Sequence, residues 1–331
     1  MQSQFSVAKP RRATTPAAHP ALAEALALVE ARLAAQIQSQ EAVLTDISSY
    51  LIGSGGKRVR PAVALLIFRA CGGQELADIV DVATALELIH SATLLHDDII
   101  DSSAVRRGKA SAFHQYGLAN TLVTGDFIFS RAFQLCARFE EKLINWAAEA
   151  CISLTEGEMM QARFRRNAAV TVNDYLEIIS RKTASIFRQG ARTAAHLARA
   201  ADPIVAAMAD CGFNVGMTFQ IVDDLLDVEG TEERLGKPTG LDLRDGNPSL
   251  PIVLALRRDP EVTRIFQDSA PTENDIALGV TRIRRSGVLG QVREMAADYG
   301  VRARRSMESL PASPDKDQLL SLIDQLIERA E

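Results

Sequence analysis

The sequence predicts an all-α protein, built as a single large helical bundle around a central cavity. From about Leu22 onward, long segments carry apolar residues at three- and four-residue spacing, which is the period of a helix with one buried face. Alternating runs of β-branched residues, which would predict strands, do not occur in the sequence. Apolar residues make up 47% of the 331 residues, which is enough for a sizeable core.

Short polar and glycine-rich segments separate the expected helices. They fall at residues 53–56, 72–73, 107–109, 167–171, 230–251 and 310–314. A further boundary falls at Asp202-Pro203, where a cap precedes a proline at the first helical position, and Arg60-Pro61 fits such a start less clearly. These breaks separate helices rather than domains, so we expect residues 21–331 to form one helical domain.

Residues 1–20 are expected to form a disordered tail. They carry Arg, Ser and Thr without an acidic residue, and prolines interrupt them. A transit peptide is the alternative interpretation of this composition.

Composition and charge exclude several classes of protein. The net charge is −5 and no basic stripe is interleaved with aromatic residues, which argues against nucleic-acid binding. No uninterrupted apolar run reaches about 18 residues, so we expect no membrane span. The four cysteines lie far apart in apolar stretches, which predicts reduced, buried thiols and a cytoplasmic protein. These cysteines are Cys71, Cys136, Cys151 and Cys211.

Two copies of the acidic pattern D-D-x-x-D stand out from this apolar helical sequence. The carboxylates are Asp97, Asp98 and Asp101 in the first copy, and Asp223, Asp224 and Asp227 in the second. A helix brings residues i and i+4 onto one face, so each copy gathers carboxylates that would repel one another without a cation between them. Oxygen-rich sites of this kind select Mg²⁺, which shares its coordination with substrate phosphates. On facing helices of a bundle the two copies would form two walls of one site.

Basic residues lie near both acidic motifs, as a diphosphate ligand would require. The segment 55–60 joins a glycine turn to three cations, Lys57, Arg58 and Arg60, at an expected helix start. Arg106 and Arg107 follow the first motif, Lys182 lies between the motifs, and Lys237 follows the second. His90 precedes Asp97 by about two helical turns and can share its face. Together these residues predict two sites for anions, as an enzyme with two diphosphate substrates needs.

The chain resembles the trans-type isoprenyl diphosphate synthases, the polyprenyl synthetase family, from about Leu22 to its C-terminus. The matching blocks are GGKRVRP, ELIHSATLLHDDIIDSSAVRRG, GDFIFSRAF, EGEMMQ, RKTASIF, FQIVDDLLD and LGKPTGLDLRDGNPSLP. The resemblance implies a transferase that condenses isopentenyl diphosphate head-to-tail onto an allylic diphosphate, such as farnesyl diphosphate. It also implies several Mg²⁺ ions per active site and a homodimer.

The same resemblance implies a role for each matching residue. Five aspartates bind Mg²⁺, with Asp227 nearby through water: Asp97, Asp98, Asp101, Asp223 and Asp224. The allylic diphosphate is contacted by Arg106, Lys182 and Lys237, with Gln220 beside it, and Thr183 orients the bound chain or stabilises developing charge. Isopentenyl diphosphate is held by Lys57, Arg60, His90 and Arg107, with Arg58 as a neighbour. Many relatives carry Lys at the position of Asn247, so Asn247 is not expected to be a ligand.

Product length is predicted from the residues one turn before the first motif. Thr93 and Ala92 lie four and five residues before Asp97, and both are small. Family members that stop early tend to carry bulky aromatic residues there, so this chain resembles the long-chain members such as octaprenyl diphosphate synthase. A long all-trans product, destined for a membrane and for example for a quinone side chain, is therefore implied.

Other functions are open to this sequence. A farnesyl or geranylgeranyl diphosphate synthase would carry the same motifs, and so would a non-catalytic partner subunit, although such subunits tend to lose the aspartates or the cations. A terpene cyclase shares the bundle but has a different second metal motif, where this chain has DDLLD. A di-iron bundle needs two E-x-x-H motifs, and the sequence supplies one, from Glu87 to His90.

Overall fold

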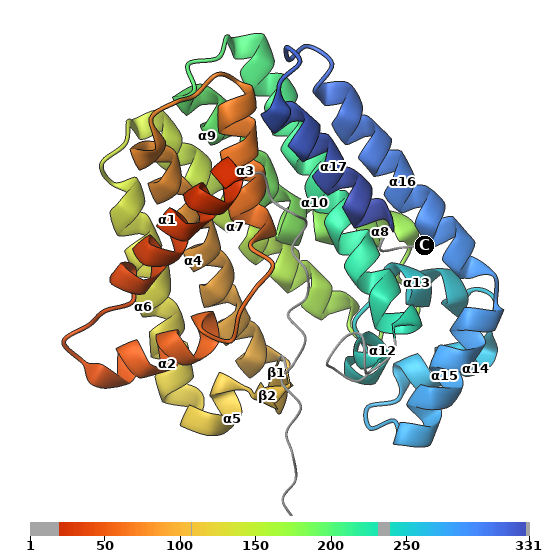
Figure 1. Ribbon diagram of the computed structural model, residues 1–331. Helices are drawn as coiled ribbons and strands as arrows, with labels where there is room; N and C mark the ends of the chain where they lie inside the picture. Colours follow the sequence, from red (N-terminus) through yellow and green to blue (C-terminus); the bar gives the residue numbers. More distant parts are fainter. Residues whose placement is uncertain (1–19, 107, 231–238, 329–331) are drawn as a thin grey trace, which may run out of the picture.

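The computed structural model of the chain describes residues 20–106, 108–230 and 239–328 (Figure 1). In chain order its elements are α1 (Pro20–Gln36), α2 (Ala42–Ile52), α3 (Val59–Ala70), α4 (Leu76–Ile100), β1 (Val105–Arg106), β2 (Lys109–Ala110), α5 (Ala112–Tyr116), α6 (Leu118–Cys136), α7 (Glu141–Phe164), α8 (Val172–Ile179), the π-helix η1 (Ser180–Ala184), α9 (Ser185–Leu197), α10 (Asp202–Glu229), α12 (Leu241–Asp245), α13 (Leu250–Leu256), α14 (Pro260–Gln267), α15 (Glu273–Arg285), α16 (Val288–Ser306) and α17 (Pro314–Glu328). The predicted all-α class is confirmed.

Helices α4 and α10 run through the core and carry the two acidic motifs. Helix α4 packs against α1, α3 and α6, while α10 packs against α9 and α16 (Figure 1). Side chains of α10 enter both apolar clusters of the core, Met208 and Val215 in one and Met217 and Leu225 in the other. A helix that is apolar on nearly every face belongs inside a bundle, because each face then finds a packing partner. The acidic motifs therefore sit at the ends of buried helices.

Two helices among the described residues are long and apolar enough to cross a membrane by length and composition alone. They are α4 and α10. In α4 78% of the most apolar window is buried inside the protein, and in α10 56% is buried. Their apolar faces are covered by neighbouring helices, which accounts for the composition of both.

The π-helix η1 joins α8 to α9 and lies against α7 and α10. Two glycines permit this close approach. A Cβ atom on Gly157 of α7 would lie 2.5 Å from the backbone nitrogen of Lys182, and one on Gly216 of α10 would lie 2.7 Å from the Cα of Ala184. Single π-turns inside helices are frequent at functional sites. Here the π-turn carries Lys182 and Thr183.

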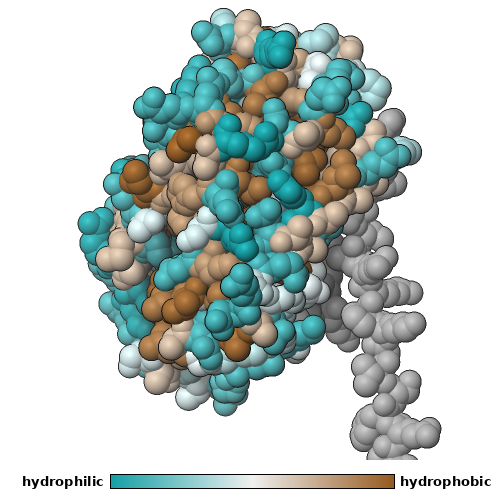
Figure 2. All heavy atoms as spheres, turned by 90° about the vertical axis from the view of Figure 1, so that its left-hand side faces the viewer, coloured by the Kyte–Doolittle hydropathy of each residue, from teal (hydrophilic) through white to brown (hydrophobic). Residues whose placement is uncertain are grey.

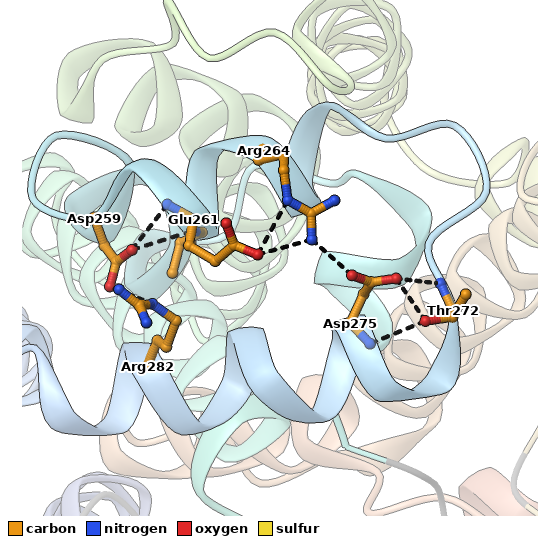
Figure 3. A network of polar contacts seen from close by, with 7 residues as sticks. Asp259, Glu261, Arg264, Thr272, Asp275 and Arg282 are labelled. Carbon is orange, nitrogen blue, oxygen red and sulfur yellow. Dashed lines mark hydrogen bonds and ion pairs between the residues drawn. The ribbon is translucent and has the colours of Figure 1, made fainter.

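Capping side chains fix the turn between α14 and α15 (Figure 3). The Thr272 and Asp275 side chains each accept a hydrogen bond from the backbone N–H of the other, at 3.1 Å in both directions. Asp259 accepts from the backbone N–H of Glu261 at 2.9 Å, and Arg264 donates to both Glu261 and Asp275. Reciprocal caps of this kind satisfy the unpaired N–H groups of a first helical turn.

Helix α15 in turn fixes the C-terminal end of α10. The Arg284 Nε atom donates to the carbonyl of Val228 at 2.7 Å, and the same guanidinium donates to the carbonyl of Gly230 at 3.3 Å. Arg293 of α16 forms an ion pair with Glu229 at 2.5 Å. The last carbonyls of a helix lack internal partners, so these cations hold the end of α10 just beyond its acidic motif.

Two local features differ from the sequence prediction. Val105 pairs with Ala110 and Arg106 with Lys109 in a two-stranded antiparallel hairpin, and strands this short show no alternation in the sequence. At the start of α10 the N-cap residue is Ala201 rather than Asp202, which lies within the first helical turn. The expected boundary at Asp202-Pro203 is otherwise correct, because helix ends vary by a residue with the local backbone.

The thiols are free, as expected. Cys151 and Cys211 are buried, while Cys71 and Cys136 are half-buried. The predicted tail lies outside the described residues except for Pro20, the first residue of α1.

Candidate active site

A cavity of about 1550 Å³ opens between the helices that carry the two motifs. Its lining comes from the loop between α2 and α3 and from α1, α3, α4, α7, α8, η1, α9, α10, α12 and α17. The lining includes nearly every described residue that the sequence singles out: Lys57, Arg58, Arg60, His90, Thr93, Asp97, Asp101, Arg106, Lys182, Thr183, Gln220, Asp223, Asp224 and Asp227. The structure thus brings together residues spread over 171 positions of the chain (227 − 57 + 1 = 171).

The carboxylates of the first motif divide between the cavity and the protein interior. Asp97 and Asp101 line the cavity, and Asp101 forms an ion pair with Arg165, the residue that follows α7. Asp98 is fully buried, is not part of the cavity lining, and forms an ion pair with Arg106. Successive helical residues are turned by about 100°, so Asp97 and Asp98 cannot share one face. Asp98 therefore fixes Arg106, while its predicted part in metal binding stays a prediction.

All three carboxylates of the second motif line the cavity, but they differ in exposure. Asp223 is exposed to the cavity, whereas Asp224 and Asp227 are 5% and 3% exposed. Asp224 accepts hydrogen bonds from the Gln220 side chain at 2.8 Å and from the backbone N–H of Leu250 at 3.2 Å. Asp227 accepts from two backbone N–H groups in the first turn of α12, the nearer at 3.1 Å. The second and third aspartates thus hold neighbouring segments against α10.

A cation bridges the acidic wall of α4 to α7. The Nζ atom of Lys182 lies 3.9 Å from Oδ2 of Asp97 and forms an ion pair with Glu158. Burial raises the pKa of the Asp97 carboxyl to about 6; the charge of Lys182 opposes this, and those of Glu158 and Asp101 add to it. Burial, the largest single effect, lowers the pKa of Lys182, but Asp97 and Glu158 together raise it above its ordinary value. Burial thus disfavours the ionised form of Asp97, and the nearby Lys182 does not fully offset it.

A chain of hydrogen bonds connects the π-helix to the second motif. The Thr183 hydroxyl donates to Oε1 of Gln220 at 2.9 Å, and Gln220 donates through Nε2 to Asp224. Tyr175 is buried beside Asp224, and burial raises the pKa of its hydroxyl well above the ordinary value. Burial likewise raises the pKa of Asp224 to about 7. This arrangement fixes the amide of Gln220 in one orientation, with its oxygen toward Thr183.

The basic side of the cavity is built by the loop before α3 and by α4. Lys57 and His90 line it, and the guanidinium of Arg60 stacks over Phe187 and Phe219, with 5.1 Å and 5.6 Å to the ring centroids. Burial lowers the pKa of Arg60. Arg58 reaches the edge of the cavity, but its guanidinium is bound to Glu30 and Glu87. Stacked aromatic rings hold the fork of Arg60 in place for a ligand.

Two expected ligands, Arg107 and Lys237, lie outside the described residues. Contacts hold the described residues nearest to them along the chain. Arg106 is paired with Asp98, and the end of α10 is held by Arg284.

Sequence reasoning overlooked several residues of the cavity wall. Glu158 and Gln161 come from the block EGEMMQ, and Asp245 comes from the block DGNPSLP. Burial, followed by the charge of Asp101, raises the pKa of Asp245 to about 6. Asn247 also lines the cavity and accepts from Gln161 at 3.4 Å. Glu158 and Gln161 are spaced i, i+3, which puts both on one helix face, and this spacing could have indicated that they share a wall of the site.

The acidic side chains suit Mg²⁺ bound together with a diphosphate. Carboxylates from α4 and α10 face one cavity, and the raised pKa of Asp97 shows that a further cation would stabilise its ionised form. Among residues 20–106, 108–230 and 239–328, no three His, Cys, Asp or Glu side chains gather closely enough to hold a metal ion by themselves. Mg²⁺ commonly takes one or two carboxylates and completes its coordination with water and substrate phosphates, so these donors fit.

A second, apolar cavity of about 30 Å³ lies farther along the same helices. Its α4 residues, Val82, Ala85, Leu86 and Ile89, continue the helix face that carries Thr93 and Asp97. Ile186 of α9 lines both cavities. Val82 lies fifteen residues before Asp97 on α4, which corresponds to a distance of about 22 Å along the helix axis. Of the two residues expected to set product length, Thr93 lines the large cavity and Ala92 is fully buried.

Comparisons with known proteins show the family of this chain. The polyprenyl synthetase family model matches residues 41–278. The octaprenyl diphosphate synthase of Escherichia coli is 33% identical over 93% of this chain and 96% of its own length. A geranylgeranyl diphosphate synthase of Methanosarcina mazei is 32% identical over 86% of this chain and 90% of its own length.

A solved structure extends the likeness to the fold. The crystal structure of a polyprenyl synthase from Caulobacter crescentus, complexed with calcium and isoprenyl diphosphate, superposes with a TM-score of 0.89. The two sequences are 33% identical, and the match covers 94% of this chain and 96% of the Caulobacter crescentus chain. With the family model matched over most of the sequence, the fold shared and both acidic motifs lining one cavity, this chain belongs to the polyprenyl synthetase family and is a prenyltransferase.

Proposed function

We propose that this prenyltransferase makes a long-chain all-trans polyprenyl diphosphate from isopentenyl diphosphate and an allylic diphosphate such as farnesyl diphosphate. The observation that carries the proposal is the row of apolar side chains that leads from the first acidic motif to the second cavity. The small side chain of Thr93 lines the start of this row, and Ala92 is buried beside it, so no bulky group blocks a growing chain there. Burial of each added five-carbon unit would contribute about 4 kcal/mol, at roughly 0.8 kcal/mol per carbon group.

The two diphosphates occupy opposite sides of the large cavity. The allylic diphosphate lies between the two acidic motifs, in contact with Arg106, Lys182 and Lys237 and beside Gln220. Isopentenyl diphosphate lies at the basic side, held by Lys57, Arg60, His90 and Arg107. The support for this division is that Lys182 lies 3.9 Å from Asp97, while the loop before α3 and His90 line the same cavity.

Mg²⁺ would be held by Asp97 and Asp101 on one wall and by Asp223 on the other. When bound, it supplies positive charge that neutralises the leaving diphosphate. Lys182 adds donors on the same side, and Thr183 stabilises positive charge that develops on the allylic carbon. The polyprenyl synthase of Caulobacter crescentus was crystallised with calcium and isoprenyl diphosphate, which supports a site for metal and diphosphate together.

The reaction proceeds in three steps at this site. The allylic C–O bond breaks and its electrons leave with the diphosphate, and the double bond of isopentenyl diphosphate then forms a C–C bond to the allylic cation. Loss of one proton from the adduct restores an alkene. Asp97, Asp101 and Asp223 would be engaged with Mg²⁺ when it is bound, so we assign the departing diphosphate as the proton acceptor.

A homodimer is the proposed assembly. Helices α6 and α7 expose apolar side chains at helical spacing, Leu118 and Leu122 on the first and Ile152 and Met159 on the second. Figure 2 shows apolar side chains among hydrophilic ones on the side of the molecule where α6 lies. Rows of exposed apolar side chains on adjoining helices suit an interface between copies.

Product analysis tests the proposal. The purified protein is incubated with isopentenyl diphosphate, farnesyl diphosphate and Mg²⁺, and the hydrolysed products are separated by chain length. We expect products of seven or more isoprene units, none in the presence of a chelator. A single product of three or four units would identify a short-chain synthase, and a cyclic hydrocarbon would identify a cyclase. Absence of any product would support a non-catalytic subunit.

A further inference from the structure

The guanidinium of Arg58 is bound by three segments of the protein. Its Nε and one terminal nitrogen donate to the carboxylate of Glu30 on α1. The other terminal nitrogen donates to Oε1 of Glu87 on α4 at 2.8 Å. The carbonyl of Ile52, the last residue of α2, accepts a further hydrogen bond at 3.3 Å. One side chain thus ties the two ends of the glycine-rich loop to α1 and α4.

The backbone of Arg58 is itself unusual. Its φ of 46° places it in the left-handed region, which residues other than glycine seldom adopt. Such a conformation persists where the surroundings determine it, and these conformations cluster at functional sites. Arg58 is the N-cap residue of α3, so its conformation sets the direction in which Lys57 and Arg60 leave the loop. The loop is therefore held in one arrangement by side-chain contacts.

Glu87 is the buried partner in this arrangement. Its side chain is 4% exposed and lies one turn before His90 on α4. Its charge acts on Arg60 as well as Arg58, and removing one partner of a buried ion pair is strongly destabilising. Glu87 thus stands between the basic loop and the histidine that faces the same part of the cavity.

We propose that Arg58 and Glu87 are positioning residues for isopentenyl diphosphate, and that Arg58 does not bind the substrate itself. Their ion pair holds the loop of residues 53–58 against α4, so that Lys57, Arg60 and His90 converge on one diphosphate. The inference rests on the proposed function, which places isopentenyl diphosphate at this side of the cavity.

Glu87→Gln tests the inference, with Asp81→Asn as a matched control. Asp81 lies on the same helix, is 8% exposed, and pairs with Arg32 of α1 at 2.7 Å, away from the cavity. Glu87→Gln is expected to raise KM for isopentenyl diphosphate at least about tenfold, because small misplacements of binding groups have large effects. KM for the allylic diphosphate should change less than about twofold. Asp81→Asn should lower Tm and leave both KM values unchanged.

A double-mutant cycle separates positioning from direct contact. If Arg58 and Glu87 act as one unit, Arg58→Lys raises KM as Glu87→Gln does, and the double variant is no worse than either. If Arg58 contacts the diphosphate, the two effects add. Additive effects would therefore overturn the proposal, even with both single variants impaired.

Hydrogen exchange supplies a readout that does not depend on turnover. Peptides covering residues 51–60 should exchange faster in Glu87→Gln than in the unchanged protein, and Asp81→Asn should leave them unaffected. Should Glu87→Gln fail to fold, Glu30→Gln removes the exposed partner, whose side chain is 48% exposed, and should show smaller shifts of the same kind. Normal loop exchange with normal KM in Glu30→Gln would then count against the proposal.

Lys57→Ala distinguishes failure of this inference from failure of the proposed function. If Lys57→Ala leaves KM for isopentenyl diphosphate unchanged, the substrate does not bind at this loop and both ideas fail. If Lys57→Ala raises that KM while Glu87→Gln does not, the binding site stands and the positioning role is wrong. The positioning role would also be refuted if Asp81→Asn raised KM for isopentenyl diphosphate as much as Glu87→Gln does.

Discussion

At the residue scale, each acidic motif separates into carboxylates that face the cavity and carboxylates that hold the structure around it. Asp97 and Asp223 are the more exposed aspartates of the two pairs, while Asp98 is buried and paired with Arg106, and Asp224 is buried and accepts from Gln220 and a backbone N–H. A helix turns about 100° per residue, so two adjacent aspartates necessarily point in different directions. In each pair D-D the first aspartate is thus the more accessible candidate ligand, and the second holds neighbouring residues in place.

The first prediction concerns the two cavity-facing aspartates. Asp97→Ala and Asp223→Ala should each lower kcat by about 10²–10³-fold, because each removes charge that acts on the leaving group. The helical far-ultraviolet circular dichroism spectrum should be unchanged. Asp126→Ala, at an α6 side chain that is 68% exposed, serves as the control and should keep full activity. Near-normal turnover in either cavity variant would contradict the metal assignment.

At the element scale, the π-helix places Lys182 and Thr183 by packing directly against α7 and α10. The contact depends on Gly157, where no side chain intervenes between the two backbones. Helices this close resist added volume, because protein interiors are already densely packed.

The second prediction tests this contact. Gly157→Ala should lower the free energy of unfolding by about 1–3 kcal/mol, since its Cβ would meet the backbone of Lys182. Activity should fall as well, through displacement of Lys182. Gly290→Ala is the control: a Cβ there meets nothing within 4 Å, so the variant should be neutral or stabilised by up to about 1 kcal/mol. Urea denaturation measures both, and equal stability of the two variants would refute the packing argument.

The third prediction concerns product length, which depends on the faces of α4 and α7. Ala92→Tyr should shorten the product, because Ala92 is fully buried next to Thr93 and a bulky ring there would displace the wall of the large cavity. Ala147→Phe should shorten it less, since Ala147 lines the more distant cavity. Ala148→Phe is the matched control for Ala147→Phe, because Ala148 is its neighbour on α7 and lines neither cavity. Chromatography of the products gives the result, and unchanged lengths in both test variants would show that the chain grows elsewhere.

At the scale of the whole molecule, the core buries both long apolar helices and all four thiol groups at least in part. Burial raises the pKa of Cys71 and Cys136 to about 11, and that of Cys151 and Cys211 to about 12. Each thiol is therefore protonated at neutral pH, and the protonated form is unreactive.

The fourth prediction follows from these thiols. At pH 8 the native protein should react very slowly with a disulfide reagent such as Ellman's reagent, because only about one thiol in a thousand is ionised when the pKa is 11. In guanidinium chloride all four cysteines should react at once. A full equivalent of fast-reacting thiol in the native protein would contradict the burial of these residues.

The all-α class, the helices that carry both acidic motifs and the basic loop before α3 all follow from sequence pattern. These features are local: helical periodicity, spacing by four residues and glycine turns operate within one or two turns of chain. The folded arrangement was needed to show which carboxylates are exposed in the cavity, that Arg58 is bound by Glu30 and Glu87, and that Glu158 joins the site. Each of these depends on contacts between helices far apart in the sequence, and a helix's own pattern does not specify which neighbour will cover a given face.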